Sequence, residues 1–123
     1  MTTSNLMAID PGSSSGAVAA IQVTQNGSCV GEPLNMPDSF EKIWDMLKCS
    51  GQYYKICVME DVGGSMPGNA AKAARTFAEH VGALKMGLIA AGIKVVLVRP
   101  QVWMKELFPG GYPQAAKGTD AKE

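Results

Sequence analysis

Two short apolar runs, at residues 6–9 and 56–59, constrain the fold of this chain more than any other feature. The second run, Ile-Cys-Val-Met, is unbroken, which is typical of a central parallel strand that is covered on both faces. Parallel strands must be joined by a crossover, which is usually a helix. Because an amphipathic helical pattern lies between the two runs, we expect them to form parallel strands of an α/β sheet.

The other patterns complete a β-β-β-α-β-α-β order that starts with an antiparallel meander. Residues 16–23 are rich in Val, Ala and Ile, and the Asn-Gly pair at 26–27 suits a tight turn into a third strand at residues 29–34. Apolar residues at positions 40, 43, 44 and 47 have helical spacing, and Asp38 is the predicted acidic N-cap of a helix that ends near Lys48. Trp44 is interpreted as a core residue of that helix.

A longer second helix is predicted from an apolar stripe between residues 70 and 91, with Gly92 as its stop signal. Residues 93–98 then form another strand, predicted to be fully buried. His80 lies within the helix and is interpreted as a surface or interface residue rather than a general base. The small residues of the helix, Gly82 among them, fit either a dimer face or close packing on the sheet.

Length and composition limit the architecture and the partners. The 123 residues allow one domain, predicted as a core at residues 1–109 followed by a polar segment at residues 110–123. Eleven basic residues balance eleven acidic ones, so any nucleic-acid partner must be held by a local patch rather than by overall charge. No run reaches the roughly 18 apolar residues of a membrane span, so we expect a cytoplasmic protein without a membrane partner. Three cysteines without metal-binding spacing are expected to be reduced thiols: Cys29, Cys49 and Cys57.

The acidic residues that end the two apolar runs are the candidate catalytic groups. If the runs are neighbouring parallel strands, Asp10 and Glu60 lie about 5 Å apart at one edge of the sheet. Two carboxylates at that separation suit a hard divalent ion such as Mg²⁺, which takes oxygen ligands and keeps waters, and hence metal-assisted phosphodiester cleavage. The structural alternative is that Asp10 opens a turn and Glu60 only ends a strand.

Several segments of the chain carry a family resemblance. The string Ile9-Asp10-Pro11-Gly12, followed by three serines and a glycine, resembles the first motif of the RuvC-like Holliday junction resolvases in the ribonuclease H-like superfamily. Residues 58–60 resemble their second acidic strand, and the helix at 69–84, the strand at 95–98 and the Pro-x-x-Trp-x-Lys segment at 100–105 follow in the order and at the spacing of that family. The Asp-x-Gly motif also opens sugar kinases and actin-like ATPases.

The resemblance implies a ribonuclease H-like mixed five-stranded sheet, a homodimer, and two-metal hydrolysis with Mg²⁺ or Mn²⁺. The implied activity is an endonuclease that nicks paired strands at a four-way DNA junction, as needed in DNA recombination and repair. Asp10 and Glu60 would be the catalytic metal ligands, and Met66 is a candidate apolar wedge in the glycine-rich loop. Three basic residues are candidates for DNA phosphate contacts: Lys72, Arg75 and Lys105.

One departure from the family pattern affects the expected activity. Family members carry a further acidic pair on a final helix, and residues 117–122 resemble only the segment that leads into it. With two carboxylates in place of four, a hard cation is held less firmly, so we expect a weak or inactive nuclease. Two alternatives stay open: a non-catalytic nucleic-acid-binding or assembly module on the same fold, and a fragment of an actin-like or sugar kinase ATPase.

Overall fold

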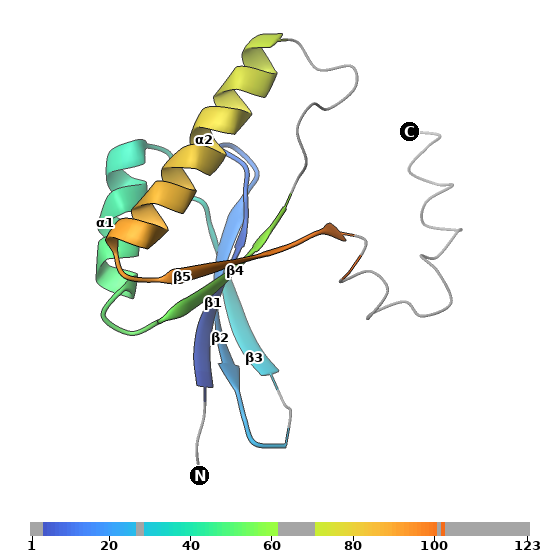
Figure 1. The fold of residues 1–123 in the computed structure, drawn as a ribbon, viewed down its shortest axis with the longest axis vertical. Helices are drawn as coiled ribbons and strands as arrows, with labels where there is room; N and C mark the ends of the chain where they lie inside the picture. The colour runs from blue at the N-terminus through green and yellow to red at the C-terminus, as the bar shows by residue number, and fades with distance from the viewer. Residues whose placement is uncertain (1–3, 27–28, 62–70, 101, 103–123) are drawn as a thin grey trace.

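The computed structural model describes residues 4–26, 29–61, 71–100 and 102. They form a five-stranded sheet and two helices (Figure 1). Along the chain the elements are β1 (Ser4–Asp10), β2 (Ala17–Val23), β3 (Cys29–Asn35), α1 (Phe40–Ser50), β4 (Ile56–Glu60), α2 (Ala71–Ala90) and β5 (Lys94–Val98). The element order predicted from the sequence is therefore confirmed.

The strand order across the sheet is β3-β2-β1-β4-β5. The first three strands pair antiparallel, whereas β1 pairs with β4 and β4 with β5 in parallel. Each parallel pair is joined through a helix, as such connections require. The mixed sheet confirms the predicted fold class, and β1 lies at its centre, between an antiparallel and a parallel neighbour.

Both helices pack against the same face of the sheet. The buried side chains form one cluster that includes Ile43 and Leu47 of α1 and Leu84 and Leu88 of α2. The strands contribute alternate residues to this cluster, because successive side chains of a strand point to opposite faces. These strand residues are Met7, Ile9, Val18, Cys57 and Met59. The helices approach closely at Gly87, where an added Cβ would lie 2.7 Å from Cδ1 of Leu47.

The opposite face of the sheet, here called the open face, is not covered by α1 or α2. Its residues follow from the pairing registers, in which Ala8 is opposite both Ala19 and Val58, and Val58 is opposite Val96. Ile56 and Val96 are exposed there, at 42% and 38%. The prediction that residues 56–59 are covered on both faces is thus wrong for the described part of the chain. An unbroken apolar run indicates a strand but cannot tell how many helices pack on it.

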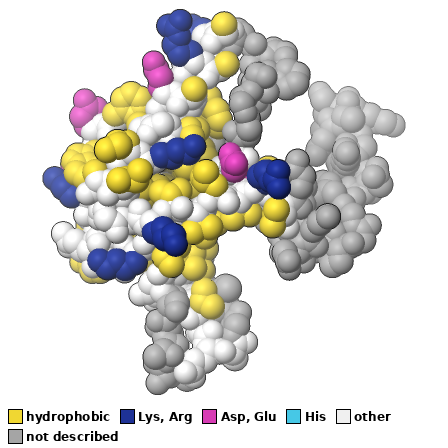
Figure 2. All heavy atoms as spheres, viewed as in Figure 1, with side chains coloured by type: hydrophobic (Ala, Val, Ile, Leu, Met, Phe, Trp, Pro, Cys, Tyr) yellow, Lys and Arg dark blue, Asp and Glu magenta, His cyan; other side chains and the backbone are white. Residues whose placement is uncertain are grey.

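Two further predictions about burial are wrong. The strand at residues 93–98 was expected to be fully buried, but β5 is the edge of the sheet, and Val96 and Leu97 are exposed. Trp44 was interpreted as a core residue, yet its side chain is 37% exposed and lines a hollow between α1 and α2. In Figure 2, hydrophobic side chains are visible at the surface over the helices and along β5, with Lys and Arg side chains among them. The apolar patterns of α1 and β5 therefore predicted more buried residues than the structure contains.

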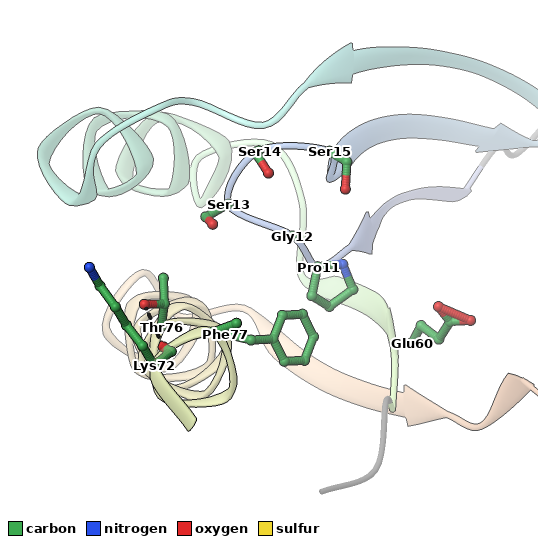
Figure 3. Close-up of a pocket in the computed structure, with 10 residues that line it drawn as sticks. Pro11, Gly12, Ser13, Ser14, Ser15, Glu60, Lys72, Thr76 and Phe77 are labelled. Atoms are coloured by element: carbon green, nitrogen blue, oxygen red, sulfur yellow. Dashed lines mark hydrogen bonds between the residues drawn. The ribbon is translucent and has the colours of Figure 1, made fainter. Parts of the chain in front are cut away.

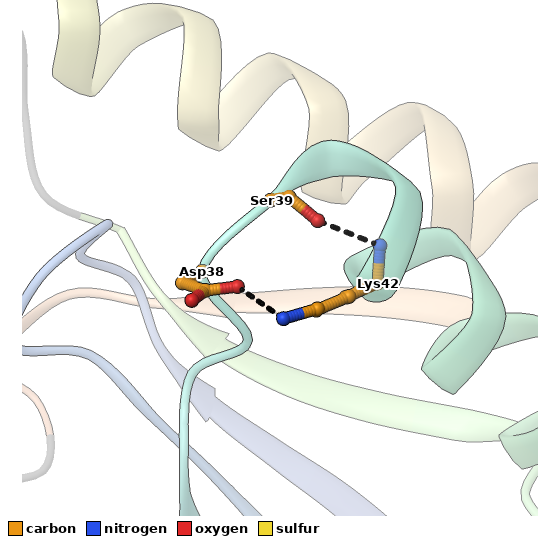
Figure 4. Close-up of polar contacts among 3 residues, drawn as sticks. All are labelled: Asp38, Ser39 and Lys42. Atoms are coloured by element: carbon orange, nitrogen blue, oxygen red, sulfur yellow. Dashed lines mark hydrogen bonds and ion pairs between the residues drawn. The ribbon is translucent and has the colours of Figure 1, made fainter.

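The N-terminus of α1 is capped by Ser39, not by Asp38 as predicted. The Ser39 hydroxyl accepts a hydrogen bond from the backbone N–H of Lys42 at 3.1 Å, while Asp38 forms an ion pair with the Lys42 ammonium at 3.0 Å (Figure 4). Both residue types favour the N-cap position, so the choice depends on backbone geometry that the sequence pattern does not show. The ion pair lowers the pKa of the exposed Asp38 carboxyl through its hydrogen bond and charge interaction with Lys42.

The stop signal of α2 is confirmed. Gly92 adopts a φ of 81°, a conformation that glycine tolerates, and its N–H donates to the Ile89 carbonyl at 3.0 Å. The chain then turns back into β5. Neither α1 nor α2 has the length and hydropathy that would let a described helix cross a lipid bilayer.

Candidate functional site

Asp10 and Glu60 lie side by side at the ends of the two central parallel strands. The register pairs Ile9 with Met59, and the two carboxylates are the next residues along β1 and β4. Adjacent strands are about 5 Å apart, so the two backbones approach each other at this separation. Ile9 and Met59 face the helices, and the alternation of side chains therefore directs both acids to the open face.

The two acids share one hollow on the open face, here called the carboxylate hollow, with a volume of about 410 Å³. Asp10 is exposed, and Glu60 is half-buried. The end of β4 is tied to β5, because the N–H of Asp61 donates to the Val98 carbonyl at 2.8 Å. The remaining lining is mostly small and apolar: Ala8, Ile9, Ala17, Val18, Ala19, Val58 and Val98. The acids are thus the only ionisable groups that line this hollow in the described part of the chain.

The loop between β1 and β2 is closed by two glycines. The N–H of Gly16 donates to the Gly12 carbonyl at 3.0 Å, and the Gly16 carbonyl accepts from the N–H of Met36 at 3.0 Å. A Cβ on Gly16 would lie 2.4 Å from the backbone carbonyl oxygen of Gly12 and 2.6 Å from that of Asp10. Real Cβ contacts are not this short. Glycine is therefore required at position 16, and the tight closure leaves residues 13–15 projecting from the loop.

A second hollow, here called the serine hollow, separates this loop from the start of α2 and has a volume of about 780 Å³. Ser13, Ser14 and Ser15 line this space, and Figure 3 shows Lys72 and Glu60 at its opposite ends. The Thr76 hydroxyl donates to the Lys72 carbonyl at 3.0 Å. Pro11, Gly12, Ala73 and Phe77 complete the lining. Glu60 lines both hollows, so they meet at this residue.

The other predicted nucleic-acid contacts are placed only in part. Lys72 is exposed and lines the serine hollow. Arg75 is exposed on α2 but does not line either hollow. Met66 and Lys105 lie outside the described residues, as does the polar segment at residues 110–123.

His80 was interpreted as a surface or interface residue rather than a general base, but the structure buries it. It is 2% exposed, and its Nε2 atom has no hydrogen-bond partner among the described residues. Burial lowers the pKa of the His80 imidazole, because the charged form would lose its hydration. His80 lines a pocket with Ser13 and the N-terminal residues of α1. His80 lies four residues before the buried Leu84, and this spacing places it on the sheet-facing side of α2.

No group of three or more His, Cys, Asp or Glu side chains is close enough to hold a metal ion within the described ranges. Among the described side chains, Cys49 is an exposed free thiol and Cys57 a buried one. Burial raises the pKa of the Cys57 thiol to about 12. Asp10 and Glu60 line one hollow, and such a carboxylate pair suits an ion that keeps several waters.

From the sequence, the serines were considered only in the actin-like or sugar kinase alternative, as part of a nucleotide phosphate loop at residues 10–16. Thr76 was not singled out, although two signals were present. Gly12 and Gly16 bracket the serines at a spacing that allows a tight loop, and Lys72 and Thr76 are four residues apart on one side of a helix. What the sequence lacked was the long-range placement of α2 opposite the loop.

The mixed five-stranded sheet with both helices on one face is an α/β fold of the ribonuclease H-like kind. Comparison with solved structures gives the particular proteins that share it. The chain is similar to Thermus thermophilus RuvC in complex with a Holliday junction substrate, with a TM-score of 0.57, 13% identity, and coverage of 85% of this chain and 70% of that one. A structure of Thermus thermophilus RuvC has a TM-score of 0.56 and 15% identity over 89% of this chain and 70% of that one.

These similarities confirm the predicted fold. At this low sequence identity, the similarities show the fold alone. No protein-family profile and no curated protein sequence matches the chain.

Proposed function

We propose that this chain is a divalent-metal-dependent endonuclease of the RuvC type, which hydrolyses phosphodiester bonds in branched DNA. The observation that supports this proposal most strongly is the shared placement of Asp10 and Glu60. They end neighbouring parallel strands, point to the same face of the sheet, and line one hollow. Two carboxylates at neighbouring strand ends repel each other unless a positive charge lies between them, and a bound cation would supply that charge.

The proposed cofactor is Mg²⁺ or Mn²⁺, held by Asp10 and Glu60. The pair fits such an ion, since Mg²⁺ in proteins is commonly bound through one or two carboxylates while it keeps waters and contacts substrate phosphates. When bound, the ion would supply Lewis acidity and a more acidic water for attack on phosphorus. Because only two carboxylates converge among the described residues, we propose weak cation binding and low activity.

The proposed substrate is a four-way DNA junction, and one of the similar RuvC structures is described as a complex with a Holliday junction substrate. A symmetric junction presents two equivalent strands, so its paired cleavage calls for two copies of the active site. We therefore propose a homodimer that acts in DNA recombination or repair. Lys72 is proposed to contact a phosphate because it lines the hollow that Glu60 also lines, and contacts by Met66 and Lys105 remain predictions.

The proposal is tested by incubating the protein with a labelled four-way junction and with linear duplex DNA, with Mg²⁺, with Mn²⁺ and with EDTA. We expect metal-dependent cleavage of the junction that Asp10→Asn and Glu60→Gln abolish. Asp45→Asn is the matched control, because Asp45 is an exposed acid on α1, away from both hollows.

Two outcomes would contradict the endonuclease. The first is no cleavage with either metal together with equal binding of junction and linear DNA. The second is selective junction binding without cleavage that neither substitution changes, which is the behaviour of a non-catalytic binding module on the same fold.

A further inference from the structure

The serine hollow has the features of a second phosphate site next to the carboxylate pair. Ser13, Ser14 and Ser15 are exposed, and none of their hydroxyls has a hydrogen-bond partner among the described residues. The Lys72 ammonium likewise has no ion-pair partner in the described part of the chain. Three hydroxyl donors and one ammonium therefore surround one space, and phosphate oxygens are the acceptors that such a donor set suits.

The loop that carries the serines is held in one shape, so that these donors are preorganised. The Gly12–Gly16 hydrogen bond closes the loop, and the Gly16–Met36 hydrogen bond anchors it to the residue that follows β3. A loop fixed in this way loses little conformational freedom when it binds a ligand. All three serines line the hollow, and Figure 3 shows the Ser13 side chain nearest to α2.

The apolar wall of the hollow suits a phosphate that carries an organic group. Pro11 and Phe77 lie together in Figure 3, and Phe77 is half-buried. An aromatic ring beside a phosphate site is a surface on which a sugar or a base can pack. A nucleotide phosphate therefore fits the lining better than inorganic phosphate does.

The position of Glu60 relates this site to the proposed active site. Glu60 lines both hollows, while Asp10 lines only the carboxylate hollow. A strand whose reacting phosphate lies at the Asp10–Glu60 pair would therefore pass Glu60 into the serine hollow. Lys72 lies at the end of that hollow away from Glu60, which separates the bound anion from the carboxylate (Figure 3).

We infer that Ser13, Ser14, Ser15 and Lys72 bind the phosphate next to the reacting one on the same DNA strand. This inference rests on the proposed function for the identity of the ligand. The same residues could bind a phosphate of a free nucleotide, and the experiment below distinguishes a DNA strand from a free nucleotide as the ligand. The four residues position the substrate and take no part in bond cleavage.

The test measures binding of a fluorescent four-way junction by anisotropy, in EDTA and over a series of salt concentrations. Lys72→Gln is expected to weaken binding about tenfold near 0.1 M salt and to reduce the slope of log affinity against log salt by about 0.9, since one phosphate contact by a cation is lost. The triple variant Ser13→Ala/Ser14→Ala/Ser15→Ala is expected to weaken binding with an unchanged slope, because the hydroxyls are neutral. Lys48→Gln, an exposed lysine on α1, should change neither quantity.

All substituted side chains are exposed, so circular dichroism melts of the variants should match the wild type. If Lys72→Gln and the triple variant bind the junction as tightly as Lys48→Gln does, the phosphate site is refuted, while cleavage that depends on Asp10 and Glu60 would leave the proposed function intact. If the wild type binds no junction, the proposed function fails, and the place of the site on a DNA strand fails with it.

Calorimetric titration with ATP distinguishes the remaining source. Binding of ATP that the triple variant abolishes, together with unchanged junction binding, would assign the phosphate site to a free nucleotide and overturn its place on the DNA strand. Absence of ATP binding together with weakened junction binding in Lys72→Gln is the result we expect.

Discussion

Replacing His80 with leucine is expected to stabilise the protein, because the change removes a buried polar atom that lacks a partner. His80 is 2% exposed, and its Nε2 has no hydrogen bond among the described residues. Burying such an atom unpaired costs about 1 to 3 kcal/mol, and leucine fills similar space without that cost. His80→Leu should therefore raise the free energy of unfolding by about 1 to 3 kcal/mol at neutral pH.

The same substitution should remove a pH dependence. The ordinary pKa of histidine is 6.5, and burial lowers the pKa of His80 in the folded protein. As the pH falls below about 6.5, the unfolded chain takes up a proton that the folded protein does not, so stability decreases with falling pH. The decrease stops below the folded pKa, and one proton contributes at most about 1.4 kcal/mol per pH unit. His80 is the only histidine of the chain, so no other imidazole contributes in this range.

The assay is urea denaturation followed by far-UV circular dichroism at about pH 8 and about pH 5, with His80→Gln as a polar control. The wild type should lose stability between the two values, and the leucine variant should lose much less. The Asp38–Lys42 ion pair does not contribute to the stability difference between these two pH values, because Lys42 lowers the pKa of Asp38 from its ordinary value of 3.8. A leucine variant that is less stable than the wild type at pH 8 would show that Nε2 has a hydrogen-bond partner, and the reasoning would fail.

Three other substitutions test the fold around the site by chemical denaturation. Gly16→Ala should destabilise the protein by about 1 to 3 kcal/mol, because its Cβ would collide with backbone oxygens. Gly82→Ala has open space for a Cβ and should be neutral or stabilising. Equal effects of the two substitutions would refute the tight loop. Leu84→Ala should cost about 2 to 5 kcal/mol as a fully buried residue, against about 0.5 kcal/mol or less for the exposed Met86→Ala, and similar costs would contradict the packing of α2. Ser39→Ala should cost about 1 kcal/mol through loss of the α1 cap, and no change would return the capping role to Asp38.

The position of the two acids could be predicted from the sequence better than the burial of individual side chains could. The convergence of Asp10 and Glu60 was predictable, because each follows an apolar run and a helical crossover makes the two strands parallel. These are local patterns combined with a topological rule. The side of the sheet on which the acids lie also follows once the register is known, since side chains alternate along each strand.

Burial was less predictable because it depends on which elements meet. Val96 belongs to an apolar strand, but β5 is an edge strand, and nothing in its own residues distinguishes an edge from a centre. Trp44 fits a helical apolar stripe, yet α2 covers only part of that stripe. His80 shows the reverse case, in which a polar residue is buried because of its angular position on α2. The serine hollow likewise required the long-range placement of α2 opposite the loop.

The most direct test of the paired carboxylates is Mn²⁺ binding measured by electron paramagnetic resonance on the wild type, Asp10→Asn, Glu60→Gln and the double variant. If both acids hold one ion, each single substitution should weaken binding about tenfold or more, and the double variant should lose less than the sum of the two separate losses. Asp45→Asn should bind like the wild type. Unchanged Mn²⁺ affinity in either single variant, or losses that simply add, would show that Asp10 and Glu60 do not share a cation.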